Sequence, residues 1–245
     1  MPITTLITAN ECLNRVAAEI GVAPVVDPFA SVDPTFIQLR YLLNTAGEEL
    51  YQAYPWELLN RSHQITTTAL DTGDYDLPDD FGYMINQTGW ERNQNVPLWG
   101  PLSPQDWTYL LGRDLVNQTI YASFRFSEGQ FKLFPQPPPD GLDVNFEYIS
   151  CAWVSDGLVP VTYKKECTTG SDIPLFDKTL ITRYTKVKIL EAKGFDSTKA
   201  QDDFNQTFSF ITGLDKGAEI LNMGRNRGFP YLNAWRNLPD TGYGY

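Results

Sequence analysis

Histidine and cysteine are scarce in this sequence, which narrows the chemistry available to the chain. His63 is the only histidine, so reactions that need several imidazoles are excluded. Ser62 is not its catalytic partner, because adjacent side chains on a strand point to opposite faces. The three cysteines, Cys12, Cys151 and Cys167, have no CxxC spacing and indicate neither a disulfide framework nor a zinc site. We expect Cys151 to be a core residue and Cys167 a loop residue with at most a slightly lowered pKa.

Catalytic and cofactor-binding motifs are also missing. The chain has no G-x-S-x-G, no phosphate-cradling glycine-rich loop and no dinucleotide fingerprint. We therefore predict that the protein is not an enzyme and has no catalytic residues, no metal site and no cofactor.

Positive charge is in short supply as well. Lys and Arg number 19 against 30 Asp and Glu, which gives a net charge of −11. Proteins that grip the phosphate backbone do so with clustered Lys and Arg. This balance argues against nucleic-acid binding as the main function, and any role near DNA would be one of not adhering to it.

Long apolar segments are absent too. No run of 18 apolar residues occurs, and no charged segment followed by an apolar one opens the chain. We expect no membrane partner and no signal peptide, and we expect synthesis in a reducing cytoplasm.

Helical periodicity is present near both ends of the chain. The predicted helices share apolar residues at three- and four-residue steps. They span residues 8–20, 33–54, 176–194 and 196–221. Thr8 with Glu11 has the spacing of a capping box, and Asp33 before Pro34 is a typical helix start.

Between these helices the pattern is that of strands. The alternating run 64–70, the turn Asp71-Thr72-Gly73-Asp74 and the segment 75–78 predict a hairpin. Further strands are predicted over 81–90, 96–99, 121–126, 131–134 and 143–154, with a short helix over 104–112. Because the connections are short, we expect about six to eight strands, mostly antiparallel.

This order of elements predicts an α+β fold with a discontinuous four-helix body, a mostly antiparallel β-rich insertion and an extended C-terminal arm. We assign residues 1–61 and 175–221 to the helical body, 62–174 to the insertion and 222–245 to the arm. The two N-terminal helices have no other apolar partner of comparable length, so they should pack against the two later helices.

One dense acidic cluster lies in the predicted hairpin. It consists of Asp71, Asp74, Asp76, Asp79 and Asp80. The spacing lacks the order of ligands of an EF-hand. Turn and capping roles for these aspartates are one interpretation, and an acidic surface that faces an interface is the other.

The segment after the last predicted helix combines arginine with aromatic residues in an acidic protein. Its candidate contact residues are Arg225, Arg227, Phe229, Tyr231, Trp235, Arg236, Tyr243 and Tyr245. Disordered tails tend to lack such aromatics. We predict that this arm docks on a neighbouring subunit or partner, with Trp235 as an anchor; an arm folded back on its own core is the alternative.

The order of elements and three short motifs resemble a known family. The motifs are Tyr54-Pro55-Trp56-Glu57 at a helix exit, Tyr75-Asp76-Leu77-Pro78-Asp79-Asp80-Phe81, and Pro101-Leu102-Ser103-Pro104-Gln105-Asp106-Trp107 at a helix start. With two helices before them and two after, they resemble the head-to-tail adaptors of tailed bacteriophages. The tail tubular protein A type of short-tailed phages is the most similar group.

This resemblance implies a structural virion protein, synthesised in the host cytoplasm and located at the head-tail junction. It implies a ring, dodecameric in that family, that binds the portal protein, a downstream tail or nozzle protein and further copies of itself. Double-stranded DNA would pass through without specific binding, and the acidic cluster would face the lumen or an interface. The net charge of −11 fits a channel that does not hold DNA.

Aromatic strands over 121–134 support a different hypothesis, a carbohydrate- or receptor-binding β-sandwich module of a tail or bacterial surface protein. Their alternation is typical of a buried face. Core packing is the simpler interpretation of these aromatics.

Overall fold

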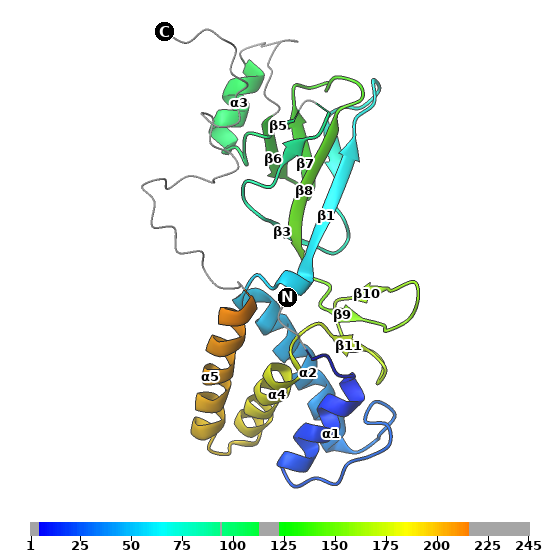
Figure 1. Cartoon of the computed structure of the whole chain (residues 1–245), viewed down its shortest axis with the longest axis vertical. Helices are drawn as coiled ribbons and strands as arrows, with labels where there is room; N and C mark the ends of the chain where they lie inside the picture. Colours follow the sequence, from blue (N-terminus) through cyan, green and yellow to red (C-terminus); the bar gives the residue numbers. More distant parts are fainter. Residues whose placement is uncertain (1–4, 94, 113–122, 216–245) are drawn as a thin grey trace, which may run out of the picture.

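The computed structural model describes residues 5–93, 95–112 and 123–215. Four of its helices lie together at one end of the molecule, and the long strands and α3 lie at the other end (Figure 1). The fold is therefore α+β, as predicted from the sequence.

The helices begin and end where local signals indicated. They are α1 (Ala9–Glu19), α2 (Pro34–Ala53), α3 (Pro104–Gly112), α4 (Lys178–Lys193) and α5 (Thr198–Asp215), with a 3-10 turn η1 at Glu57–Leu59. Thr8 Oγ1 accepts a hydrogen bond from the N–H of Glu11 at 3.3 Å, and Asp33 caps α2. Gly194 ends α4 with a φ of 71°, a conformation that glycine adopts without strain. The predicted end of the last helix near residue 221 lies outside the described residues.

Helix α4 is the centre of the helical part, since it contacts α1, α2 and α5. It carries five Lys or Arg and one Glu, and three of these cations each bind a neighbouring helix. Lys186 pairs with Glu19 of α1 at 2.8 Å, Lys188 with Glu49 of α2 at 2.6 Å, and Arg183 donates to the carbonyl of Asp203 in α5 at 2.9 Å. The basic helix thus offsets acidic charge of its neighbours.

The strands form three small sheets. They are β1 (Asn60–Thr66), β2 (Asp74–Asp76), β3 (Phe81–Met84), β4 (Trp90–Glu91), β5 (Val96–Pro97), β6 (Ser123–Ser127), β7 (Gln130–Phe134), β8 (Asp143–Ser150), β9 (Val154–Ser155), β10 (Tyr163–Lys164) and β11 (Ile173–Pro174). In the first sheet β8 pairs with β1, β3 and β4, and β4 pairs with β5; the other two are β10-β9-β11 and β2-β7-β6. Every ladder between these strands is antiparallel.

The predicted hairpin between residues 64 and 78 is wrong. Strand β1 pairs with β8, with Asn60 opposite Ile149, whereas β2 pairs with β7 in another sheet. Asp71 accepts hydrogen bonds from the N–H and the hydroxyl of Thr68, so this connection closes on itself as a local turn. The two strands therefore separate into different sheets.

Three smaller differences concern strand limits and number. The run 81–90 forms two short strands, β3 and β4, separated by a turn at residues 86–87. On either side of this turn, the N–H of Ile85 and the hydroxyl of Thr88 donate to the Glu147 carbonyl of β8. Strand β8 is the longest, as predicted, but ends at Ser150 rather than at residue 154. The described residues contain eleven short strands, more than the expected six to eight.

One predicted hairpin is confirmed. Strands β6 and β7 pair around Glu128-Gly129. Both turn residues have positive φ, 58° and 76°, as a two-residue turn between right-twisted strands requires. The connector over 135–139 is present but is not extended throughout, because residues 135–137 form bends.

Two apolar cores hold the molecule together. The first joins α1, α2, α4 and α5 and includes Trp153, Val154 and Cys167 from the segment after β8. The second fills the space between β1, β6, β7 and β8. Helices that are far apart in sequence thus share one core, and the strands between them have their own.

The cysteines differ in part from expectation. Cys151 is half-buried, whereas Cys167 is buried in the first core. The Asn44 side chain accepts from the N–H of Cys167 and donates to its carbonyl. Burial raises the pKa of the Cys167 thiol, so the expected slight lowering is wrong.

Candidate interaction surface

His63 has no arrangement suited to catalysis. Its ring lies against Phe146 at 5.5 Å between centroids, and burial lowers its pKa. The carboxylate of Asp80, which acts on His63 electrostatically, is bound to the Tyr148 hydroxyl and the Ser150 hydroxyl at 2.9 and 2.7 Å. The imidazole is therefore a packing group at the edge of the second core.

The described residues contain no group of three or more His, Cys, Asp or Glu side chains placed to hold a metal ion. Within the same residues, no helix has the length and apolarity needed to cross a membrane.

The acidic cluster is largely tied into the local structure. Asp71 binds Thr68 and the Tyr75 hydroxyl, Asp80 binds Tyr148 and Ser150, and the remaining carboxylates lie at the surface. Asp74 and Asp76 accept hydrogen bonds from Gln136 and Gln130, and Asp79 is exposed without a polar partner among the described residues. Turn roles therefore account for Asp71, in agreement with one of the two interpretations.

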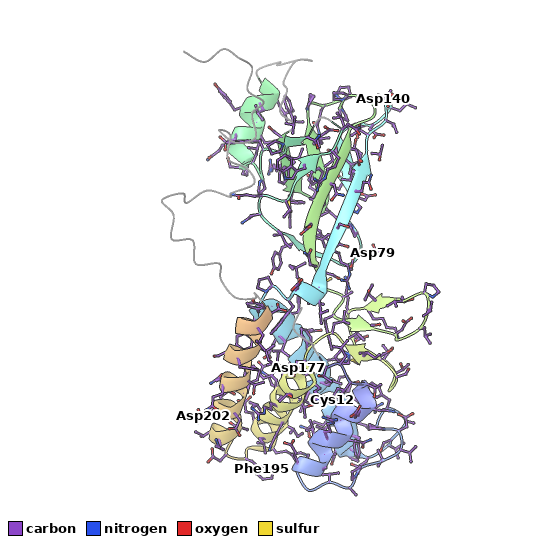
Figure 2. The ribbon with its side chains drawn as sticks, viewed as in Figure 1. Cys12, Asp79, Asp140, Asp177, Phe195 and Asp202 are labelled. Atoms are coloured by element: carbon purple, nitrogen blue, oxygen red, sulfur yellow. The ribbon has the colours of Figure 1, made fainter. Side chains whose placement is uncertain are left out.

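Negative charge nevertheless concentrates in the β-rich part. The described residues between 60 and 150 include eleven carboxylates and four Lys or Arg, a net charge of −7 out of −11 for the chain. These carboxylates are Asp71, Asp74, Asp76, Asp79, Asp80, Glu91, Asp106, Glu128, Asp140, Asp143 and Glu147. Asp79 lies near the helices and Asp140 at the far end of the strands (Figure 2). The charge thus extends along the length of this part.

The aromatic residues of β6 and β7 are mainly buried. Phe124, Phe131 and Phe134 belong to the buried core, and the Phe131 ring stacks on Phe146 at 5.2 Å. A sugar-binding face needs exposed rings, so these strands do not supply one. Core packing is the confirmed interpretation.

The motif Tyr54-Pro55-Trp56-Glu57 connects the two parts of the molecule. The Trp56 Nε1–H donates to the Leu50 carbonyl at 2.7 Å, and its ring meets Phe176 and Phe208 edge-on. The chain leaves α2 there and enters β1 through η1. This motif is thus a structural joint that fixes where the strands start relative to α4 and α5.

Exposed apolar side chains gather in the loop between β9 and β10 and at the first residue of β10. They are Leu158, Val159, Val161 and Tyr163. Sequence reasoning did not single out this loop, although the uninterrupted run Gly157-Leu158-Val159-Pro160-Val161 between polar residues was a signal for it.

A groove of about 570 Å³ lies between the start of α4 and the end of α5. Phe210, Ile211 and Leu214 of α5 form its apolar wall. Its charged lining is mixed and consists of Lys178, Arg183, Asp177 and Asp215. Phe210 and Leu214 are exposed. The groove has the mixed lining expected of a protein-binding site.

The predicted arm residues, Arg225, Arg227, Phe229, Tyr231, Trp235, Arg236, Tyr243 and Tyr245, lie outside the described residues. Their docking role stays a prediction.

The fold is α+β, and the features described above are surfaces. The family model described as SU10 adaptor protein matches residues 7–219. The chain therefore belongs to the SU10 adaptor protein family, and this family suggests a structural adaptor of a bacteriophage. The protein is thus a virion component, and its family implies contacts with portal and tail proteins. No curated protein matches the chain.

Proposed function

We propose that this protein forms a ring, dodecameric as in the adaptors it resembles, that connects the portal to the tail and continues the DNA channel. The observation that carries this proposal is the family match across residues 7–219. We further propose that it serves a short-tailed phage, as an adaptor of the tail tubular protein A type. In that case the downstream partner is a nozzle protein.

The distribution of charge supports a channel. A net charge of −7 over residues 60–150 repels the phosphate backbone when the β-rich part lines the lumen. The exposed carboxylates Asp74, Asp76 and Asp79 would then face DNA or the adjoining subunit. DNA would move past them without being held.

The same charge predicts that assembly depends on the portal. Copies with a net charge of −11 repel one another in a closed ring, and this cost must be offset by additional buried surface. We expect the isolated chain to be largely monomeric and the ring to form on portal rings.

Electron microscopy of the purified chain, alone and with portal rings of the same phage, tests the function. The expected result is monomers alone and a second ring beneath the portal in the mixture. A chain that never associates with the portal would contradict the proposal. A stable ring in low salt without portal would contradict only the dependence on the portal.

The C-terminal arm is the second part of the proposal. Residues 224–245 carry three Arg, one Asp and five aromatic side chains in an otherwise acidic protein. Arginine with aromatics is the typical composition of a binding segment, so the arm would dock on the portal or on a neighbouring copy.

Truncation after Asn222 separates docking from an intramolecular role. A docking arm predicts an unchanged melting temperature and loss of portal binding. Earlier melting with normal assembly would show instead that the arm stabilises its own subunit.

A further inference from the structure

The loop between β9 and β10 is held in one shape by its own polar residues. The Asp156 carboxylate accepts hydrogen bonds from the N–H groups of Leu158 and Thr162, both at 3.1 Å. The N–H of Asp156 in turn donates to the Thr162 carbonyl at 3.1 Å. Such a loop loses little conformational freedom on binding, which lowers the entropic cost of a contact.

Both parts of the molecule anchor the base of this loop. Val154 of β9 lies in the helical core, and the Arg61 guanidinium of β1 lies 4.2 Å from the centre of the Tyr163 ring. The loop is therefore a fixed projection and not a hinge.

The tip of the loop is apolar and faces solvent. Leu158 is 66% exposed and Val159 is 95% exposed, and Pro160 and Val161 complete the run. Several exposed aliphatic side chains in one short loop make it a candidate interaction site.

We propose that this tip inserts into the α4–α5 groove of a second copy of the chain, so that each copy contributes the tip on one side and the groove on the other. In Figure 1 the β9–β10 loop projects from one side of the helical part, and α5 lies along the opposite side. A contact between two different surfaces of identical chains repeats in one direction and closes into a ring when the rotation permits. This inference deepens the proposed ring and rests on it.

The groove has an apolar wall that could bind the apolar tip. Its wall of Phe210, Ile211 and Leu214 is apolar, and the side chain of Lys178 at its edge forms no hydrogen bond or ion pair within the described residues. At the base of the loop, Asp156 forms no ion pair in the described structure. Asp177 and Asp215 line the groove together with Lys178 and Arg183, so the apolar wall, and not an excess of positive charge, is the surface that the tip would bind.

Leu70 provides a matched control for the tip. Like Val159 it is an aliphatic residue that is 95% exposed, but it lies in the turn between β1 and β2. Neither Val159→Asp nor Leu70→Asp should change the melting temperature, because neither side chain is buried. Assembly of the full chain on portal rings should weaken roughly tenfold or more for Val159→Asp and stay at the wild-type level for Leu70→Asp.

A mixing experiment tests the direction of the contact. Val159→Asp disrupts the tip, and Phe210→Asp disrupts the groove. In an equimolar mixture, the intact tip of the Phe210→Asp chain can still bind the intact groove of the Val159→Asp chain, so each mixed pair retains one contact. In a second experiment, a photo-crosslinking residue replaces Val159 in the otherwise wild-type chain. It should form crosslinks to residues 206–215 of a second copy. Crosslinks to the portal, or Val159→Asp rings that form like wild type, would overturn this inference while leaving the adaptor function in place. Failure of the wild-type chain to bind portal rings at all, with copy-to-copy crosslinks still formed, would overturn the function and leave the contact standing.

Discussion

The Asp215 carboxylate accepts a hydrogen bond from the backbone N–H of Glu57 at 3.1 Å and so joins residues 158 positions apart. Asp215 is the last described residue of α5, and Glu57 opens the turn that leads into β1. Nearby, the Tyr54 hydroxyl donates to the Thr212 carbonyl of α5 at 3.3 Å. The exit of α2 is therefore fixed to residues 212–215 of α5, and the start of the β-rich part is fixed with it.

Trp56 should be the main stabilising residue of this joint. Trp56→Phe removes the donor to the Leu50 carbonyl and part of a buried ring, and we expect a loss of about 1–3 kcal/mol in the free energy of unfolding. Trp99→Phe is the control. Because Trp99 is 71% exposed, this substitution should change the free energy of unfolding little. Denaturant unfolding measures both, and equal effects would argue against the joint.

Replacement of Gly47 in α2, even by alanine, should lower the stability of the protein. A Cβ atom there would overlap the Trp153 indole, so Gly47→Ala should destabilise the protein by about 1–3 kcal/mol through overpacking. Gly213→Ala in α5 is the matched control, since nothing lies within 4 Å of its Cβ position. It should raise stability by about 0.5–1 kcal/mol from helix propensity. The test is whether the two substitutions change the stability in opposite directions, which melting curves of the two variants would show.

At low pH the protein should lose the stability that the ionised Asp172 carboxylate contributes. Burial opposes ionisation of this carboxyl, but hydrogen bonds from Lys164 and from the N–H groups of Thr169 and Thr168 outweigh it and lower the pKa to about 2. The pKa of Asp172 in the folded state lies below the unfolded value of 3.8. The stabilisation by its carboxylate is therefore complete above about pH 4 and is lost as the pH falls toward 2.

Asp172→Asn should therefore cost roughly 2 kcal/mol at neutral pH, and the difference from wild type should shrink between pH 4 and 2. Asp203→Asn breaks an exposed pair with Lys199 and should leave the acid transition nearly unchanged. Unfolding curves across this pH range compare the three proteins. A constant difference for Asp172→Asn would contradict the assignment.

The three cysteines should differ in reactivity. Burial raises the pKa of Cys12 to about 12 and also raises the pKa of Cys167, so little thiolate forms at pH 8. Cys151 is half-buried. Maleimide labelling of the native protein should modify Cys151 first, and the other two only after unfolding, as mass spectrometry would show. Rapid labelling of Cys12 in the native protein would contradict its burial.

Limited proteolysis tests the proposed division into a helical body, residues 1–61 and 175–221, and an insertion, residues 62–174. First cleavage is expected in the insertion or in residues 222–245, because the helices share one core. An independently folded fragment 1–61 would contradict this division.

Several features followed from the sequence alone because their causes are local. Thr8, Asp33 and Gly194 set helix ends through contacts within a few residues. The β6–β7 hairpin followed from the Glu128-Gly129 turn. Composition fixed the excess of negative charge, and the order of elements pointed to the adaptor family that the match over residues 7–219 established.

Other features were decided only by the tertiary structure. An alternating strand specifies which face is buried but not its partner, so β1 could not be assigned to β8, more than 75 residues later, from its own pattern. The same holds for Cys167, which is buried because Asn44 binds its backbone, and for Gly47, whose neighbour Trp153 is distant in sequence. The sequence contains the apolar run 157–161, but only the packing of β9 and β10 directs it into solvent, because exposure depends on what the rest of the chain leaves uncovered.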